Sequence, residues 1–310
     1  TAALEANLLS GEIDMIEGSL GLALDQATAF ETRHGDRFKV FYKPGLIYEH
    51  IDMRLDNPIL ADRRVRQALI MSLDREALSQ QLFDGRQAVA HGNVNPLDWV
   101  HTEDVPTYDE DLEAAGALLD EAGWSDIRDG VRHNAAGEPL SLTIMTTAGN
   151  RTRELVQQVL QSMWQRLGID VSIQNEPARV FFGETMSKRR FTGLAMYAWI
   201  SSPENVPRST LHSEEIPTEA NGWSGQNYPG FVNAEMDALI DEIEITLDRD
   251  AREQLWHALQ RVYATELPVI PLYFRAEAHI WPSWLAGVAP TGHMGATSLT
   301  VEDWHVAGGG

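Results

Sequence analysis

Residues 140–174 read LSLTIMTTAGNRTRELVQQVLQSMWQRLGIDVSIQ, and this stretch decides the fold class. Its first nine residues carry alternating apolar side chains, which predict a strand. Apolar side chains then recur every three or four residues from Arg151 to Leu167, which predicts an amphipathic helix ending at Gly168. A second strand, residues 169–174, follows at once. A strand, a helix and a strand with such short connections are typical of an α/β fold.

Further helices and strands are predicted on both sides of this stretch. Residues 47–58 and 269–275 have strand character, and we interpret them as two strands that cross between lobes. A helix over the first ten residues should end near Gly11 and be followed by a strand. The other predicted helices cover residues 65–73, 108–124, 179–187, 234–246 and 249–265, and a buried strand covers residues 194–200.

Composition excludes several classes of function. The 310 residues include 46 acidic and 24 basic side chains, and a formal charge of −22 repels nucleic acid and anionic membrane surfaces. There is no Cys, so disulfides, thiolate metal sites and a cysteine nucleophile are not available. No apolar run reaches the roughly eighteen residues of a membrane span. We therefore expect no nucleic-acid partner and no membrane insertion.

Four arginines are concentrated in residues 62–78, DRRVRQALIMSLDREAL, although the chain is acidic. Val65, Ala68 and Leu69 repeat on one helical face, which leaves the arginines elsewhere, and Asp62 is placed as an N-cap. We interpret the arginines as a solvated helix face with ion pairs, and not as a phosphate site.

Sequence motifs for catalysis are absent. The chain has no G-x-S-x-G, no H-E-x-x-H and no P-loop, and its only lysines are Lys39, Lys43 and Lys188. We therefore predict no catalytic residues, no metal site and no cofactor. The start of the chain inside a βα pattern, without Met or a leader, is interpreted as an internal cut.

A long irregular segment follows the strand at residues 194–200. Residues 201–231 show no periodicity, and loops of this length are usually functional. Aromatic rings alternate there with amides and a guanidinium, which suits a small-molecule cleft at the carboxyl end of a strand. Packing in the core or on the surface is the alternative for each ring. The candidate ligand-binding residues are Tyr197, Trp199, Ser201, Ser202, Glu204, Asn205, Arg208, Trp223, Gln226 and Tyr228.

Five blocks occur in a familiar order along the chain. They are N-x-x-x-A-D-x-x-V-R-Q-A-L-x-x-x-x-D-R-x-x-L from Asn57, Y-D-x-x-x-x-x-A-x-x-L-L-x-E-A-G-W from Tyr108, E-x-x-x-x-x-x-L-x-x-x-G-I-x-V, N-Y-P-G-F-x-N-x-E-x-D-x-L-I and L-P-V-I-P-L-Y. Together they resemble the family 5 extracellular solute-binding proteins, the dipeptide, oligopeptide and nickel receptors of ABC importers. The resemblance covers nearly the whole chain.

The resemblance implies a two-lobed fold like that of type II periplasmic binding proteins, α/β in class, here mostly lobe II with fragments of lobe I. It implies a truncated tail of lobe I in residues 1–46, a crossover strand in 47–56, lobe II in 57–268, and a crossover strand with the C-terminal return to lobe I in 269–310. It also implies that the V-R-Q-A-L block is a structural helix and not a ligand site.

The family pattern for peptide recognition departs from this sequence at one point. In peptide receptors a Trp at the strand end is followed within a few residues by an Asp that pairs with the α-ammonium of the peptide. Trp199 matches the aromatic residue, but the first acid after it is Glu204. Either Glu204 pairs with the amine from a shifted position, or the solute has no free amine.

The function implied by the resemblance is that of a periplasmic receptor, not an enzyme. It would capture a small peptide or related solute by lobe closure and deliver it to the ABC permease subunits, and we expect it to act as a monomer. Two alternatives remain at this point: an α/β hydrolytic enzyme, or a ligand-sensing module on the same scaffold.

Overall fold

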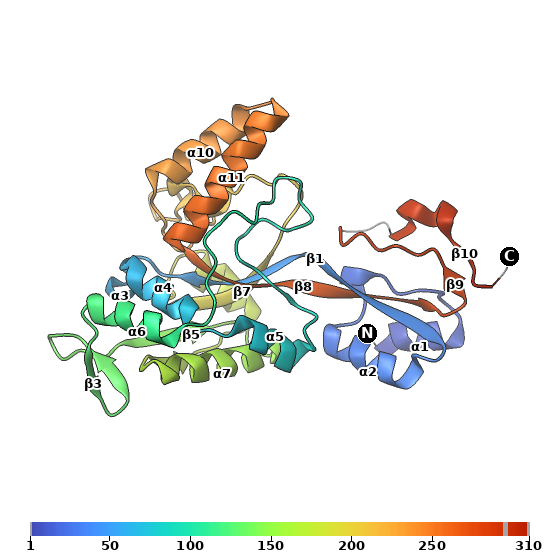
Figure 1. Ribbon diagram of the computed structural model, residues 1–310, viewed down its shortest axis with the longest axis horizontal. Coiled ribbons are helices and arrows are strands. Elements are labelled where there is room, and N and C mark those ends of the chain that lie inside the picture. The colour runs from blue at the N-terminus through green and yellow to red at the C-terminus, as the bar shows by residue number, and fades with distance from the viewer. Residues whose placement is uncertain (1, 294–296, 309–310) are drawn as a thin grey trace. The chain divides into compact units, whose positions relative to one another are not determined.

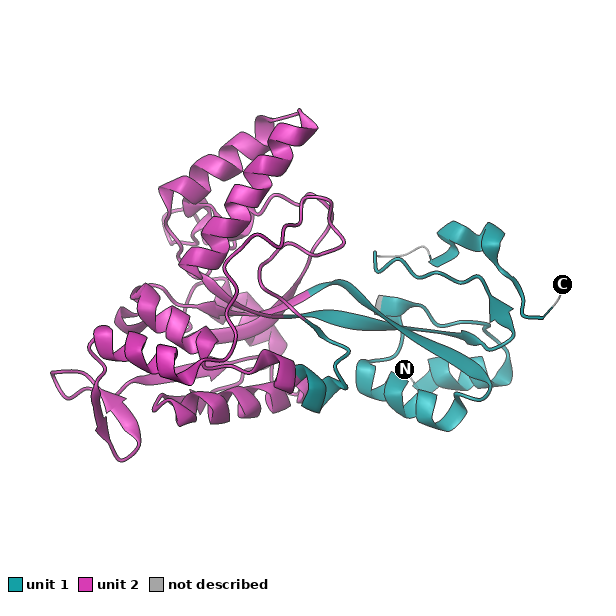
Figure 2. Ribbon diagram, in the orientation of Figure 1, with its two compact units in different colours: residues 1–47, 79–88, 273–310 teal, residues 48–78, 89–272 magenta. Residues whose placement is uncertain are grey.

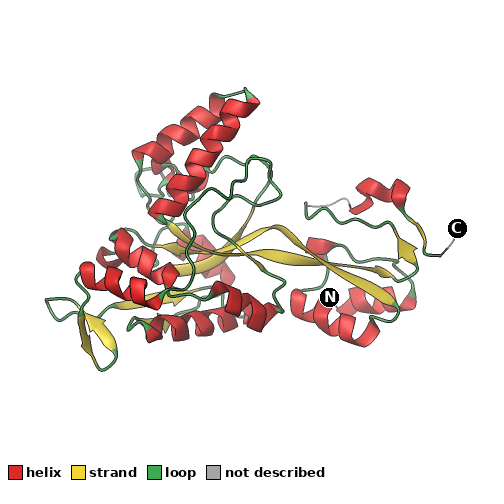
Figure 3. Cartoon of the chain, viewed as in Figure 1, coloured by secondary structure: helices red, strands yellow, loops and turns green. Residues whose placement is uncertain are grey.

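The chain forms two compact units in a computed structural model that describes residues 2–293 and 297–308 (Figures 1 and 2). Unit 1 comprises residues 1–47, 79–88 and 273–310, and unit 2 comprises residues 48–78 and 89–272. Figure 3 shows helices and strands in both units, so the α/β class predicted from the sequence is confirmed.

The predicted strand, helix and strand of residues 140–174 are present in unit 2. β5 (Ser141–Met145) leads into α7 (Arg151–Arg166), and α7 returns into β6 (Asp170–Ile173). β5 pairs in parallel with β6 and with β7 (Leu194–Ile200), whose bounds match the prediction. The full sheet has six strands in the order β2-β8-β1-β7-β5-β6. Parallel pairing places the carboxyl ends of β5, β6 and β7 at one edge.

Two long strands belong to this sheet and continue into unit 1. β1 (Phe38–Met53) begins nine residues before the predicted start, and β8 (Val269–Pro282) ends seven residues after the predicted end. The predicted start of β1 was too late because Pro44 and Gly45 normally interrupt a strand. Within unit 1, however, a Cβ at position 45 would lie 2.7 Å from Glu277 Cδ. Glycine therefore permits a close approach of Glu277 without ending the strand.

Unit 1 has a small core of its own. α1 (Ala2–Ser10) and α2 (Leu24–His34) pack apolar side chains such as Leu8 and Phe30 against Phe38 and Ile280. The predicted strand after Gly11 was wrong, because Ile16 makes only a single bridge to Ile280. β9 (Leu285–Ala286) and β10 (His305–Val306) form an antiparallel pair near the C-terminus.

Several helices of unit 2 cover its strands, and two others form an αα-hairpin. α4 (Arg63–Met71) packs on α6 (Leu112–Glu121), and α10 (Ala234–Ile245) packs on α11 (Arg249–Glu266). The remaining helices and strands are α3 (Pro58–Ala61), α5 (Arg75–Phe83), which continues into unit 1, β2 (Ala88–Val89), β3 (Asp126–Arg128), β4 (Val131–His133), α8 (Ala178–Val180) with a π-helical turn (Phe181–Met186), and α9 (Arg208–Leu211). Among the helices of the described residues, none has the length and apolar character to span a bilayer.

The arginine cluster is only partly a solvated surface. Arg63 and Arg64 are exposed and pair with acids, as predicted. Arg66 is 5% exposed and donates to the main-chain oxygens of four residues at the ends of α3 and α11. Arg75 is also buried and donates to three main-chain oxygens. The prediction was wrong for Arg66 and Arg75, because the apolar periodicity of a helix does not show that buried main-chain carbonyls nearby require a long side-chain donor.

Candidate ligand-binding site

One face of β1 carries three polar side chains into the interior of unit 2. Tyr48, His50 and Asp52 alternate along the strand, so their side chains lie on the same side of the sheet. Their exposed fractions are 4%, 1% and 3%. The imidazole of His50 stacks on the Tyr48 ring at 5.1 Å between centroids, and His50 Nε2 lies 3.4 Å from Asp52 Oδ1. A carboxylate is thus buried among aromatic rings.

The neighbouring strand β7 supplies aromatic side chains to the same place. The hydroxyl of Tyr197 donates to Asp52 Oδ2 at 2.6 Å, and its ring meets His50 edge-on at 4.5 Å. Trp199 lies two residues further along the strand, 5.5 Å from the Tyr197 ring. Tyr228 stacks behind Trp199 at 6.4 Å. These rings form a stack that begins at the buried carboxylate and ends at the strand terminus.

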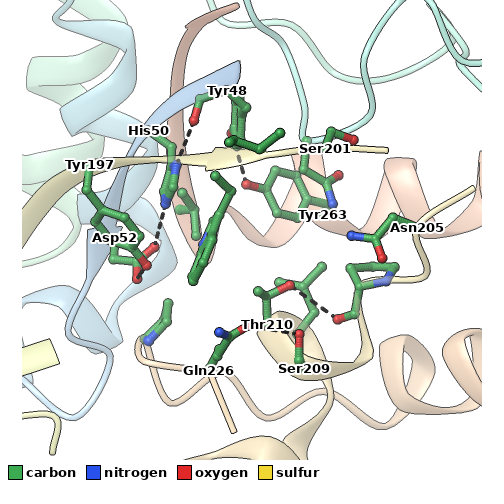
Figure 4. A pocket seen from close by; sticks show the side chains of 17 residues that line it. Tyr48, His50, Asp52, Tyr197, Ser201, Asn205, Ser209, Thr210, Gln226 and Tyr263 are labelled. Atoms are coloured by element: carbon green, nitrogen blue, oxygen red, sulfur yellow. Dashed lines mark hydrogen bonds and ion pairs between the residues drawn. The ribbon is translucent and has the colours of Figure 1, made fainter. Parts of the chain in front are cut away.

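A pocket with a cavity of about 130 Å³ lies against these strands (Figure 4). All of its lining residues belong to unit 2. The segment after β7 forms the opposite wall, where Figure 4 shows Asn205, Ser209, Thr210 and Gln226 across from His50 and Asp52. The lining residues are Tyr48, His50, Asp52, Asn93, Tyr197, Trp199, Ile200, Ser201, Asn205, Pro207, Ser209, Thr210, Leu211, Gln226, Pro229, Tyr263 and Val269.

The phenols around the pocket are held in their neutral form. Burial and the nearby Asp52 carboxylate raise the pKa of Tyr197 well above its usual range. Burial likewise raises the pKa of Tyr48 and of Tyr263, whose hydroxyls lie 3.1 Å apart. Phenols that keep their protons act as hydrogen-bond donors. The pocket therefore combines apolar ring faces, neutral donors and one carboxylate.

Five of the ten sequence-predicted residues line this pocket. They are Tyr197, Trp199, Ser201, Asn205 and Gln226. They come together because β7 ends at the pocket and the irregular segment folds back beside it. The main-chain N–H of Gln226 donates to Ser209 O at 2.8 Å, which holds the early and late parts of that segment together.

Glu204 and Arg208 have other partners. Trp99 Nε1 donates to Glu204 Oε1 at 2.6 Å, and Arg252 Nε donates to Glu204 Oε2 at 3.0 Å. Arg208 pairs with Glu244 at 2.8 Å and with Asp241. Both side chains connect the irregular segment to other parts of unit 2, and neither lines the pocket.

The remaining three predicted residues also lie outside the pocket lining. The main-chain oxygen of Ser202 accepts from the N–H of Asn205 at 3.1 Å in a turn. Tyr228 is buried behind Trp199. Trp223 is 36% exposed, on a surface turn where its φ is 63°.

Sequence reasoning missed the contribution of β1, α11 and the loop that carries Asn93. Residues 47–58 were interpreted only as a crossover strand. The signal that could have found the site is the polar face within that strand, since Tyr48, His50 and Asp52 recur at every second position. Tyr263 gave no such signal, because it lies on the apolar stripe of a helix and is indistinguishable there from a core residue.

The described residues offer no metal site in this pocket or elsewhere, since no group of three or more His, Asp or Glu side chains is placed to hold an ion. The arrangement can instead bind an organic solute. Ring faces provide contact area, and a few convergent polar groups orient the ligand.

Comparison with known proteins identifies the family to which this chain belongs. Residues 1–216 match the family described as bacterial extracellular solute-binding proteins, family 5 Middle, and the chain belongs to this family. The resemblance noted in the sequence blocks is therefore confirmed, and so is the two-lobed binding-protein fold class that it implied.

The similar proteins include two peptide-binding proteins. The oligopeptide-binding protein AppA of Bacillus subtilis (strain 168) is 28% identical over 98% of this chain and 54% of its own length. A crystal structure of an oligopeptide-binding protein from Thermus thermophilus with a pentapeptide is 32% identical, with a TM-score of 0.79, over 93% of this chain and 52% of that chain. The structure of B. subtilis AppA with a nonapeptide has a TM-score of 0.77. This chain spans about half the length of these relatives.

Proposed function

We propose that this chain is part of a periplasmic solute-binding receptor of an ABC importer. The receptor captures a small peptide or related solute, closes on it, and delivers it to the permease subunits as a monomer. The observation that carries the proposal is the pocket of unit 2, whose ring faces and buried Asp52 carboxylate suit an organic solute. Relatives described as oligopeptide-binding proteins support a peptide as that solute.

The proposed contact residues come from β7 and the segment after it. Tyr197, Trp199, Ser201, Asn205 and Gln226 touch the solute, together with the polar face of β1. Tyr228 supports Trp199 from behind, and Glu204 and Arg208 hold the segment against other parts of unit 2. Ser202 and Trp223 lie outside the pocket lining. Lobe II at residues 57–268 stays part of the proposal, and the extent of unit 2 supports it in outline.

Native mass spectrometry of the intact protein tests the proposal. We expect the protein to carry bound species with peptide masses, which are released when it is denatured. Calorimetry with the released compounds should then show saturable binding without turnover. If neither co-purified solutes nor added peptides of two to nine residues bind, the peptide-receptor function is wrong. If the bound compound is chemically converted, an enzyme is the better description.

A further inference from the structure

Two hydrogen-bond acceptors face each other in the wall of the pocket. His50 Nδ1 lies 3.3 Å from the main-chain oxygen of Tyr48. A carbonyl oxygen only accepts, so Nδ1 carries the proton of the neutral ring, and Nε2 is left as an acceptor. Nε2 is buried without a hydrogen-bond partner and lies 3.4 Å from Asp52 Oδ1, which is a second acceptor. This pair requires a donor.

Among the described residues, the one buried guanidinium that acts electrostatically on this group of side chains belongs to Arg75, which affects Tyr48 but donates its hydrogen bonds to main-chain oxygens. On β1, the Tyr48 ring stacks on His50, and on β7, Tyr197 donates to the other carboxylate oxygen of Asp52. From α11, Tyr263 reaches the hydroxyl of Tyr48. Within the described part of the chain, neither Arg nor Lys forms an ion pair with Asp52. The side chains that the structure pairs with the Asp52 carboxylate are thus one phenol and one imidazole.

A buried carboxylate without a cationic partner is unfavourable. We infer that, in the receptor proposed above, on which this inference rests, Asp52 Oδ1 and His50 Nε2 together bind a positively charged N–H group of the solute. An ammonium has three N–H donors and a guanidinium has five, so either can serve both acceptors. The ring faces of the pocket also favour a cation.

The positive group has two possible sources, the terminal amine of a peptide or the side chain of Lys or Arg. Four pentapeptide probes separate them in calorimetry on the intact protein: Ala-Ala-Lys-Ala-Ala, the same peptide with norleucine in place of Lys, and the N-acetylated form of each. If the site binds the side chain, the affinity for the Lys peptide should exceed that for the norleucine peptide by about tenfold or more. If the site binds the terminus, the affinity for the free amine should exceed that for the acetylated form by a similar factor.

Two variants identify the residues. Asp52→Asn keeps the shape and removes the charge, so it should abolish the observed preference. Asp56→Asn is the matched control, because Asp56 lies outside the pocket lining and pairs with Arg54 and Arg189. It should leave the preference intact.

The results distinguish failure of the inference from failure of the proposed function. Binding of none of the four peptides overturns the peptide receptor and the inference with it. Binding of all four with equal affinity in the wild type overturns the inference alone, as does a preference that survives in Asp52→Asn. The wild-type measurements decide these points even if a variant fails to fold.

Discussion

Trp199 is the largest ring that lines the pocket, and it is held between Tyr197 and Tyr228. Aromatic side chains fixed by their neighbours contribute strongly to binding because little entropy is lost on contact. We expect Trp199→Ala to weaken solute affinity at least tenfold, about 1.4 kcal/mol, in calorimetry on the intact protein. Trp223→Ala removes a ring from the same segment outside the pocket lining and should change the affinity less than about twofold. Equal effects of the two changes would remove Trp199 from the site.

Glu204 gives a second prediction at the scale of one residue. Its carboxylate accepts from Trp99 and from Arg252, so Glu204→Gln should lower the free energy of unfolding by about 1 kcal/mol, measured with urea. The solute affinity should not change, because the side chain does not line the pocket. A large loss of affinity for peptides with a free amine, and no loss for acetylated ones, would instead make Glu204 the ammonium partner.

Five of the ten residues proposed from the sequence line the pocket, because they lie at the end of β7 or in the irregular segment that follows it. The sequence could not show that Glu204 faces Arg252, since 48 residues separate them along the chain. It also gave no sign that β1 lies beside β7 in the sheet. Local patterns report which residues share a face of one strand or helix, whereas the partner of that face depends on the tertiary fold.

At the scale of secondary structure, Arg66 connects the end of α3 to the end of α11. Its guanidinium donates to the main-chain oxygens of Leu60, Ala61, Glu266 and Leu267. Arg66→Met removes these bonds and leaves buried acceptors unpaired, each at about 1–3 kcal/mol, so we expect a loss of about 3 kcal/mol or more of unfolding free energy. Arg63→Met should lose less than about 1 kcal/mol, because Arg63 forms an exposed ion pair. Similar losses in urea unfolding would contradict this assignment.

The capping of α11 can be tested separately. Asp248 Oδ1 accepts from the main-chain N–H of Ala251 at 2.9 Å, so Asp248→Ala should cost about 1 kcal/mol of unfolding free energy. Asp250 is also acidic and lies in the first turn, but it is not the capping residue. Asp250→Ala should therefore have a smaller effect, a few tenths of a kcal/mol from the helix dipole. The reverse order in urea unfolding would show that the cap is not formed in solution.

Helices and strands were largely predictable from the sequence. α7, α10 and α11 lie within one residue of their predicted ends, because each has a long apolar stripe and a recognisable cap. The lengths of β1 and β8 were underestimated, because the length of a strand also depends on its partner strands. In addition, β1 continues through Pro44 and Gly45, which usually interrupt a strand. The division into compact units was not predicted either: residues 79–88, which include the end of α5, belong to unit 1, although the chain on both sides of them belongs to unit 2.

At the scale of the whole molecule, the buried phenols predict how stability depends on pH. Tyr48, Tyr197 and Tyr263 have pKa values raised by burial in the folded state, while in the unfolded chain they ionise near pH 10. Above about pH 10 the unfolded chain therefore binds fewer protons than the folded one. The free energy of unfolding should then fall with rising pH, by up to about 1.4 kcal/mol per pH unit for each tyrosine. Below pH 10 this contribution is fully present.

Urea unfolding of the intact protein, followed by tryptophan fluorescence from pH 8 to pH 11, measures this slope. Tyr263→Phe keeps the ring but removes one ionisable phenol, so it should reduce the alkaline slope by about one proton. Tyr108→Phe is the comparison: burial also raises the pKa of Tyr108, but less strongly, since part of its side chain remains accessible, and its effect on the slope should be smaller. If the wild-type stability were constant up to pH 11, the phenols would be accessible to water in solution. The conclusion that buried, neutral phenols surround the pocket would then be wrong. The physical basis for placing the Asp52 carboxylate among neutral hydrogen-bond donors would be lost as well.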